Sequence, residues 1–182
     1  MRTRLTLVLA VAAASVLAGC GESAPTHSAG LASPASPSAA DQPSKVDRAW
    51  LKIIHVGNLA EIEAGRLAES KGASNQVKSI GKMLVDDHTE LDTKVTEVAG
   101  KLGVQLPDGV TGKHAAVAKR LAKASGRDFD QEWIAAMTKA HTAALTATKK
   151  EASNGSSPSV VALAKSAIPA LEDHLAALQK AG

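Results

Sequence analysis

The sequence predicts an all-α protein whose main domain is an antiparallel four-helix bundle, built from two helical hairpins with a short extra helix in the connection. Two observations carry this prediction. Four long segments after residue 46 repeat apolar or small residues at 3–4 spacing, and no run alternates as a half-buried strand would. Glycine and proline fall between these segments, with two short gaps and one long one, as expected for two hairpins.

Residues 1–19 are expected to be a signal peptide. Arg2 and Arg4 precede an uncharged apolar run over residues 5–17, which is too short to span a bilayer as a mature helix. The run closes on Leu17-Ala18-Gly19-Cys20, which resembles the lipobox of bacterial lipoproteins. That resemblance implies that Cys20 is lipidated and anchors an exported protein to the extracytoplasmic face of the cell membrane. The alternative is an ordinary signal peptide followed by an incidental cysteine.

Residues 20–45 are expected to be the lipidated cysteine and a disordered Ser/Ala/Pro linker, because they hold four of the seven prolines and little to bury. The remaining residues, 46–182, form the helical domain. Removing Arg2 and Arg4 leaves 19 basic against 18 acidic side chains, so the basic pI does not indicate a nucleic-acid partner. The sequence identifies no protein partner.

The first predicted hairpin joins helices at about 47–71 and 74–103. The first helix has Trp50, Ile54 and Ala64 on one face and stops before Gly72. Ser74 is a suitable N-cap for the second helix, whose stripe includes Leu84.

The second hairpin follows a connection that contains a short helix at about 114–124. Its first helix is expected to begin near Asp128, with Gln131 completing a capping box, and to end at residues 154–155. Its second helix opens on Ser157-Pro158, an N-cap followed by an N1 proline. Pro169 lies inside this helix and should kink it.

An internal sequence repeat indicates that the two hairpins are related by a pseudo-twofold axis. The pattern Asp47-x-x-Trp50 in the first helix recurs as Asp130-x-x-Trp133 in the third, and Asp-Asp-His at 86–88 is matched by Glu-Asp-His at 172–174.

Each of the four long helices places one ionisable side chain on its apolar face. These residues are Glu61, His88, His141 and His174. Counting 1.5 Å per residue from the hairpin turns puts them within a slab of roughly 10 Å. His55 lies at the same level and could join them, and the candidate hydrogen-bond partners around the group are Asn58, Asp87 and Asp92.

Two interpretations of this inward cluster stay open. Buried ionisable groups must pair, change protonation or bind something, and three imidazoles with a carboxylate suit one zinc, iron, manganese or copper ion. Alternatively, neutral imidazoles form a hydrogen-bonded polar layer with Glu61 and Asn58. No HExxH, Glu-x-x-His, phosphate loop or GxSxG occurs, and there is no tyrosine, so an enzyme is the less favoured class.

The domain resembles the bacterial exported family catalogued as domain of unknown function 4142. The resemblance rests on His55-x-x-Asn58-Leu59-Ala60-Glu61, Val85-x-Asp87-His88, Gly126-x-x-Phe129-Asp130-x-x-Trp133, His141 and Ile168-Pro169-x-Leu171-x-x-His174. It implies a ferritin-like fold and an envelope location, with no settled activity. The sequence thus favours a lipid-anchored bundle that binds a transition metal, with a non-catalytic envelope protein as the alternative and a metal-dependent oxidase as a third hypothesis.

Overall fold

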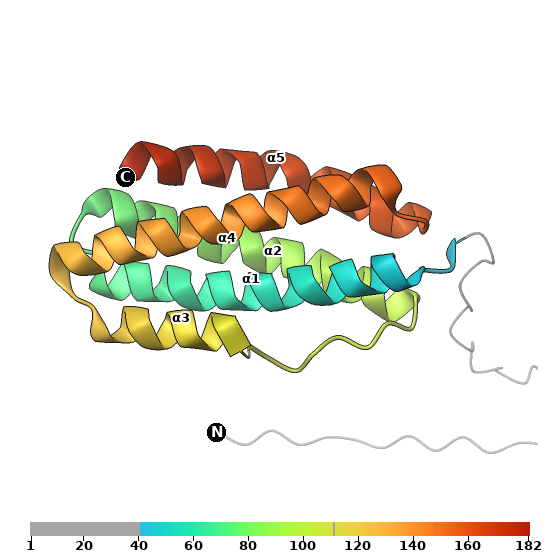
Figure 1. The fold of residues 1–182 in the computed structure, drawn as a ribbon, viewed down its shortest axis with the longest axis horizontal. Helices are drawn as coiled ribbons and strands as arrows, with labels where there is room; N and C mark the ends of the chain where they lie inside the picture. The colour runs from blue at the N-terminus through green and yellow to red at the C-terminus, as the bar shows by residue number, and fades with distance from the viewer. Residues whose placement is uncertain (1–40, 111) are drawn as a thin grey trace, which may run out of the picture. The chain divides into compact units, whose positions relative to one another are not determined.

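A computed structural model describes residues 41–110 and 112–182. The predicted signal peptide, the lipobox cysteine Cys20 and the linker up to residue 40 lie outside the described residues. The described part holds five helices in the predicted order (Figure 1): α1 Lys45–Lys71, α2 Asn75–Lys101, α3 Gly112–Lys123, α4 Gly126–Asn154 and α5 Pro158–Ala181. The prediction of an all-α bundle is confirmed.

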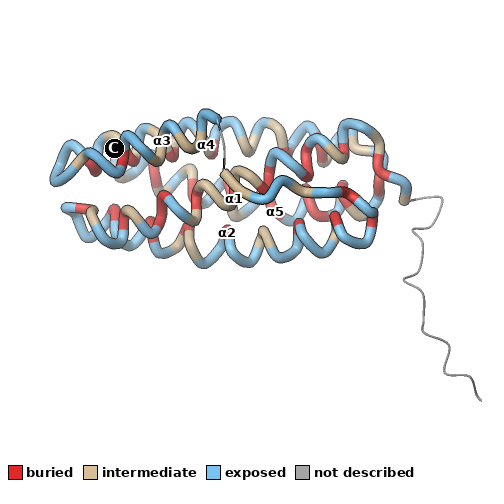
Figure 2. Tube along the Cα trace, turned by 90° about the horizontal axis from the view of Figure 1, so that it is seen from below, coloured by how far each residue is buried: buried red, intermediate tan, exposed pale blue. Residues whose placement is uncertain are grey.

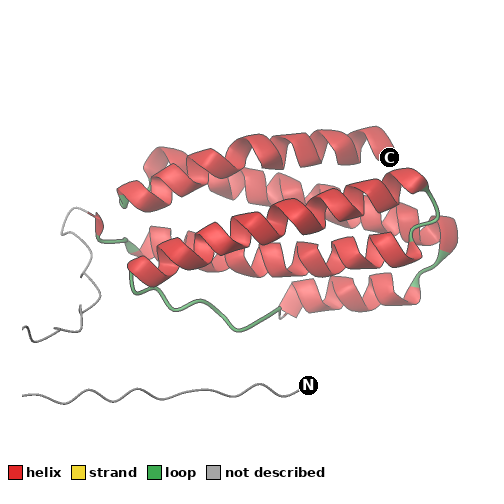
Figure 3. Ribbon diagram, turned by 180° about the vertical axis from the view of Figure 1, so that it is seen from behind, coloured by secondary structure: helices red, strands yellow, loops and turns green. Residues whose placement is uncertain are grey.

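The four long helices form two antiparallel hairpins that pack side by side. Helix α1 contacts α2 and α4, and α5 also contacts α2 and α4, so the helices follow one another around the bundle as α1, α2, α5, α4. The short helix α3 lies outside this set and packs mainly on α1 (Figure 1). Viewed from behind, short turns close the two hairpins, whereas a long loop leads from α2 to α3 (Figure 3).

The turn of each hairpin is held by an aspartate from the other hairpin. Asp130 on α4 accepts the backbone N–H groups of Ala73 and Ser74, in the α1–α2 turn, at 2.8 Å each. Asp47 on α1 accepts those of Ser156 and Ser157, in the α4–α5 turn, at 2.9 and 3.3 Å. These amides have no intrahelical acceptor, so the aspartates satisfy groups that would otherwise be unpaired. The aspartates of the repeated Asp-x-x-Trp pattern therefore have the same structural role, because each one binds the turn of the other hairpin.

The two tryptophans of the repeated pattern also form hydrogen bonds between the hairpins. The indole N–H of Trp50 donates to the Thr148 hydroxyl on α4 at 3.3 Å, and that of Trp133 donates to the Ala64 carbonyl on α1 at 2.8 Å. Both rings are buried. Each end of the bundle therefore has one tryptophan that joins α1 to α4.

The helices begin within two residues of the predicted positions, with α1 starting at Lys45 instead of near Asp47 and α4 at Gly126 instead of near Asp128. Helix α1 begins with a reciprocal capping box between Ser44 and Asp47. The predicted capping box at Asp128 and Gln131 is wrong, because α4 begins at Gly126 and leaves Asp128 in its first turn. Gly126 has φ of 60°, a conformation that glycine adopts at little cost, and it lets the chain turn directly from α3 into α4.

Buried residues recur along the inner sides of the helices (Figure 2). They form two apolar clusters, and buried polar residues lie between them. One cluster lies at the end that contains Trp50, Val95 and Val160, and the other at the end that contains Leu84, Phe129 and Trp133. Pro169 is accommodated inside α5, which continues as a helix through it. Among the described helices, none has a stretch long and apolar enough to cross a membrane.

Helices α1 and α2 are in close contact at a pair of buried glycines, Gly65 and Gly81. A Cβ atom placed on Gly81 would lie 2.6 Å from the Ala68 Cβ and 2.8 Å from the Gly65 carbonyl oxygen. A Cβ on Gly65 would lie 2.6 Å from the Gly81 carbonyl oxygen. The absence of side chains at these two positions therefore sets the spacing of the first hairpin.

Candidate metal centre

The polar layer between the two apolar clusters is built from the four inward residues that the helical periodicity selects. Glu61 comes from α1, His88 from α2, His141 from α4 and His174 from α5. Their exposed fractions are 5%, 1%, 0% and 2%. His141 Nε2 lies 3.3 Å from both His88 Nε2 and His174 Nδ1, and one ligand atom from each imidazole falls within 4.8 Å of the others.

Each imidazole is oriented by an acceptor on its outer side. His141 Nδ1 lies 3.0 Å from the Met137 carbonyl, and His174 Nε2 lies 2.8 Å from the Asp87 carboxylate. His88 Nδ1 lies 3.0 Å from Asn58 Oδ1, whose amide NH₂ donates to Asp92 at 3.3 Å. A carbonyl or carboxylate oxygen only accepts, so these three ring nitrogens are the protonated ones.

When each imidazole is neutral, the three remaining ring nitrogens carry lone pairs that face one another. Burial lowers the pKa of His88 well below its usual range, and His141 and His174 lower it further. Burial also lowers the pKa of His174, although the hydrogen bond to Asp87 opposes this shift. Neutral imidazoles with converging lone pairs repel one another unless a proton or a cation lies between them. This arrangement, with an outer acceptor on each ring, is that of histidines that ligate metals.

Glu61 supplies an oxygen on one side of the imidazoles. Its Oε2 lies 3.1 Å from His88 Nε2, and its Oε1 lies 3.4 Å from His141 Nδ1. Burial raises the pKa of Glu61, and attraction to His141 offsets this only in part. An ionised carboxylate at this depth requires a compensating positive charge.

Three of the separations between these donors match those around a tetrahedral ion. Metal–nitrogen and metal–oxygen bonds of about 2.0–2.1 Å place neighbouring ligand atoms about 3.3–3.4 Å apart in a tetrahedron. His141 Nε2 lies 3.3 Å from the ring nitrogens of His88 and His174, and the Glu61 oxygen lies 3.1 Å from His88 Nε2. Three imidazoles and one carboxylate are ligands that zinc and other first-row metals accept.

His55 does not belong to this group, although it lies on the same helix as Glu61. Its Nδ1 lies 2.8 Å from Asp92 and its Nε2 lies 3.1 Å from the Pro107 carbonyl, so both ring nitrogens have partners. Asp92 thus contacts His55 and Asn58 and reaches His88 only through Asn58. His55 ties the loop after α2 to this outer network.

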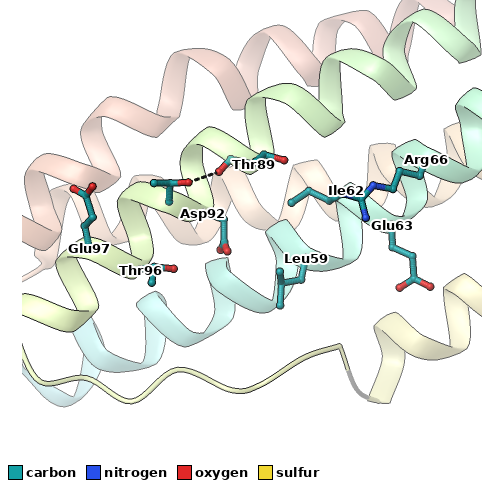
Figure 4. A pocket seen from close by; sticks show the side chains of 9 residues that line it. Leu59, Ile62, Glu63, Arg66, Thr89, Asp92, Thr96 and Glu97 are labelled. Atoms are coloured by element: carbon teal, nitrogen blue, oxygen red, sulfur yellow. Dashed lines mark hydrogen bonds between the residues drawn. The ribbon is translucent and has the colours of Figure 1, made fainter. Parts of the chain in front are cut away.

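A larger pocket, of about 530 Å³, lies on the outer face of the α1–α2 hairpin and is separate from the imidazoles (Figure 4). It is lined by Leu59, Ile62 and Arg66 on α1 and by Thr89, Asp92 and Glu97 on α2. Asp92 is the member of the outer network that faces this groove. The groove is open and contains no cluster of metal-ligating side chains, so the buried layer remains the candidate site.

Two further ionisable residues, one beside the layer and one at the end of the bundle, were not singled out from the sequence. His114 on α3 is half-buried and lines two small pockets that also contain Glu61. Glu151 on α4 is buried beside Asp47. Glu151 continues the 3–4 series of His141 and Thr148, which was the signal available in the sequence.

Fold and site together define an all-α bundle with a buried layer of three histidines and one glutamate. Residues 32–181 match the model of the family described as domain of unknown function DUF4142. The chain therefore belongs to the DUF4142 family, as the sequence resemblance predicts. No curated protein matches the sequence.

The bundle is also similar to a solved structure. The crystal structure of a DUF305 fragment from Deinococcus radiodurans superposes with a TM-score of 0.68 over 76% of this chain and 96% of that one. The two sequences are 12% identical, so the likeness concerns the fold alone.

Proposed function

We propose that this protein binds one first-row transition-metal ion (zinc, iron, manganese or copper) through His88, His141, His174 and Glu61. The observation that carries the proposal is the convergence of three ring nitrogens in the bundle core, on imidazoles whose other nitrogens each face an outer acceptor. The ion supplies the positive charge that offsets Glu61 and relieves the repulsion between the lone pairs. Metal handling or redox protection at the cell envelope is the role that this site supports.

The test is metal analysis by mass spectrometry on protein purified without an affinity tag or chelator. We expect near-stoichiometric metal in the wild type and loss of metal in a His88→Ala/His141→Ala double variant that retains its helical circular dichroism. His114→Ala, which removes a histidine outside the cluster, is the matched control and should keep the metal. Wild-type protein that is metal-free and also resists titration with zinc, iron and copper would contradict the proposal.

The competing function is a non-catalytic envelope protein whose polar layer specifies the fold. It is favoured by one observation: among buried side chains of the described residues, only Glu151 Oε1 lacks a hydrogen-bond partner. A protonated Glu61 that donates to His88 would complete such a layer without metal. In that case the wild type binds no ion, and Glu61→Gln leaves its stability unchanged.

We further propose that the domain is held to the membrane through a lipid on Cys20, on the extracytoplasmic face. The proposal rests on the lipobox-like sequence Leu17-Ala18-Gly19-Cys20. Expressed in a bacterial host, the wild type should fractionate with membranes, whereas Cys20→Ser should not and Ser23→Ala should behave as the wild type does. Membrane association that persists in Cys20→Ser would contradict the anchor.

A further inference from the structure

A metal centre buried to this depth requires a path by which the ion arrives. Three pockets of the described residues contain one or more of the proposed ligands. One lies between α2 and α5 and contains His88 and His174; we call it the α2–α5 pocket. The other two lie between α1, α3 and α4 and both contain Glu61 and His114; we call them the α1–α4 pockets.

The α2–α5 pocket suits a hydrated cation. Its volume is about 160 Å³, room for a few water molecules at about 30 Å³ each. Asp87 and Glu90 line it together with one lysine, Lys94, which is paired with Glu90 at 2.6 Å. Asp87 is half-exposed and bonds His174 at 2.8 Å, so its carboxylate reaches from solvent to a proposed ligand.

The α1–α4 pockets suit a cation less well. Their volumes are about 100 and 40 Å³, and alanine is the commonest residue of their walls, joined by Trp50, Ile53 and Ile54 in the larger one. Lys113 adds a positive charge to the larger one, and Glu61 lies at the inner side. An ion that crosses such a surface loses hydration and gains at most His114 as a ligand before it reaches Glu61, which is unfavourable.

We propose that metal ions reach the buried site through the α2–α5 pocket, with Asp87 as the first carboxylate that they meet. The proposal rests on the metal site proposed above. It adds the side of the bundle from which the ion enters and the requirement that the entering species be positively charged. The excess of negative charge at the pocket mouth attracts divalent cations, and the small side chain of Ala170 keeps the passage open on the α5 side. The contact between the His174 ring and Asp87 lies on this path and opens as the ion passes.

The experiment closes this pocket after the protein has folded. Cys20 is the only cysteine of the chain, so Ala170→Cys in the full chain with Cys20→Ser carries a single thiol. Labelling it with a benzyl methanethiosulfonate places a phenyl ring in the pocket. Uptake of cobalt(II) is followed by the visible absorption of the bound ion. Removal is followed by the decay of this absorption after EDTA is added. Ala143→Cys, which lines the larger α1–α4 pocket, is labelled identically as the matched control.

We expect the label at position 170 to slow both uptake and removal at least tenfold, with the same final cobalt content, and the label at position 143 to change neither rate. Unchanged rates at position 170, or slowing only at position 143, would overturn the proposed path while the metal site stands. Failure of the unlabelled protein to bind cobalt would instead overturn the metal site and the path together.

Discussion

At the scale of single residues, the carboxyl group of Glu151 is held in an unusual setting. Burial raises its pKa to about 7, and the hydrogen bond and charge of Asp47 act in the same direction. Burial alone would raise the pKa of Asp47, but hydrogen bonds from Glu151, Ser156 and Ser44 outweigh it and lower that pKa to about 2. Glu151 also lies in the last turn of α4, where the helix dipole disfavours an anion. The pair thus shares one proton, which resides on Glu151.

This pairing predicts how stability depends on pH. The folded pKa of Glu151 lies above its ordinary value of 4.5, so the folded state retains a proton that the unfolded state releases between these values. Its contribution to the free energy of unfolding therefore falls as pH rises from about 4.5 to 7, by roughly 3 kcal/mol. Urea unfolding of metal-free wild type and Glu151→Gln should show the variant gaining relative stability toward pH 8. Parallel curves from pH 4 to 8 would contradict this account.

A second residue-scale prediction concerns Asn58, which holds the His88 ring. Asn58→Ala removes the acceptor for His88 Nδ1 and breaks the connection to Asp92. Loss of such an outer partner lowers metal affinity about 10–100-fold. Competition with a chelator should show this loss at unchanged helix content, whereas Asn154→Ala, at the exposed end of α4, should bind as the wild type does. Equal affinities for the Asn58 variant and the wild type would show that Asn58 does not position a ligand.

At the scale of helices, the glycines of the first hairpin have opposite roles. Gly57 has open space around it, so Gly57→Ala should stabilise α1 by about 0.5–1 kcal/mol through helix propensity. Gly81→Ala introduces a methyl group against Ala68 and the Gly65 carbonyl and should destabilise the protein by about 1–3 kcal/mol. Thermal unfolding of the two variants measures whether each substitution raises or lowers the stability of the protein. A gain in stability for Gly81→Ala would mean that the helices separate there at little cost.

At the scale of the whole molecule, the reciprocal aspartates couple the two hairpins. Asp130→Ala leaves two amides of the α1–α2 turn without their acceptor and should reduce the free energy of unfolding by about 2 kcal/mol. Unfolding should remain a single transition, because the second hairpin loses its partner when the first one opens. Asp128→Ala, an exposed neighbour on the same helix, is the control and should change stability by less than about 0.5 kcal/mol. Equal stabilities for the two variants would contradict the coupling.

Helical periodicity was sufficient to predict the fold and the four residues of the polar layer. Glu61, His88, His141 and His174 each lie on an apolar face, and antiparallel hairpins fix their levels. The partners of His55 could not be predicted in this way, because Asp92 and Pro107 depend on the path of the loop after α2. The start of α4 depends on the positive φ of Gly126, which a count of capping residues does not reveal.

The protonation of Glu151 also could not be predicted from the sequence, because its partner is distant along the chain. Its position in the 3–4 series marks it as inward-facing, yet the neighbour that adds to the effect of burial on its pKa, Asp47, comes from another helix about a hundred residues earlier. A sequence pattern gives the direction of a side chain, whereas its charge state depends on contacts that only the assembled bundle provides.

The two crossing tryptophans have a practical consequence for experiments on this protein. The chain contains no tyrosine and only these two tryptophans, so its near-ultraviolet emission arises from Trp50 and Trp133 alone. One indole lies in each apolar cluster, and each donates to the opposite hairpin. The fluorescence of Trp50→Phe and Trp133→Phe proteins would therefore report the opening of each end of the bundle separately, without any added dye.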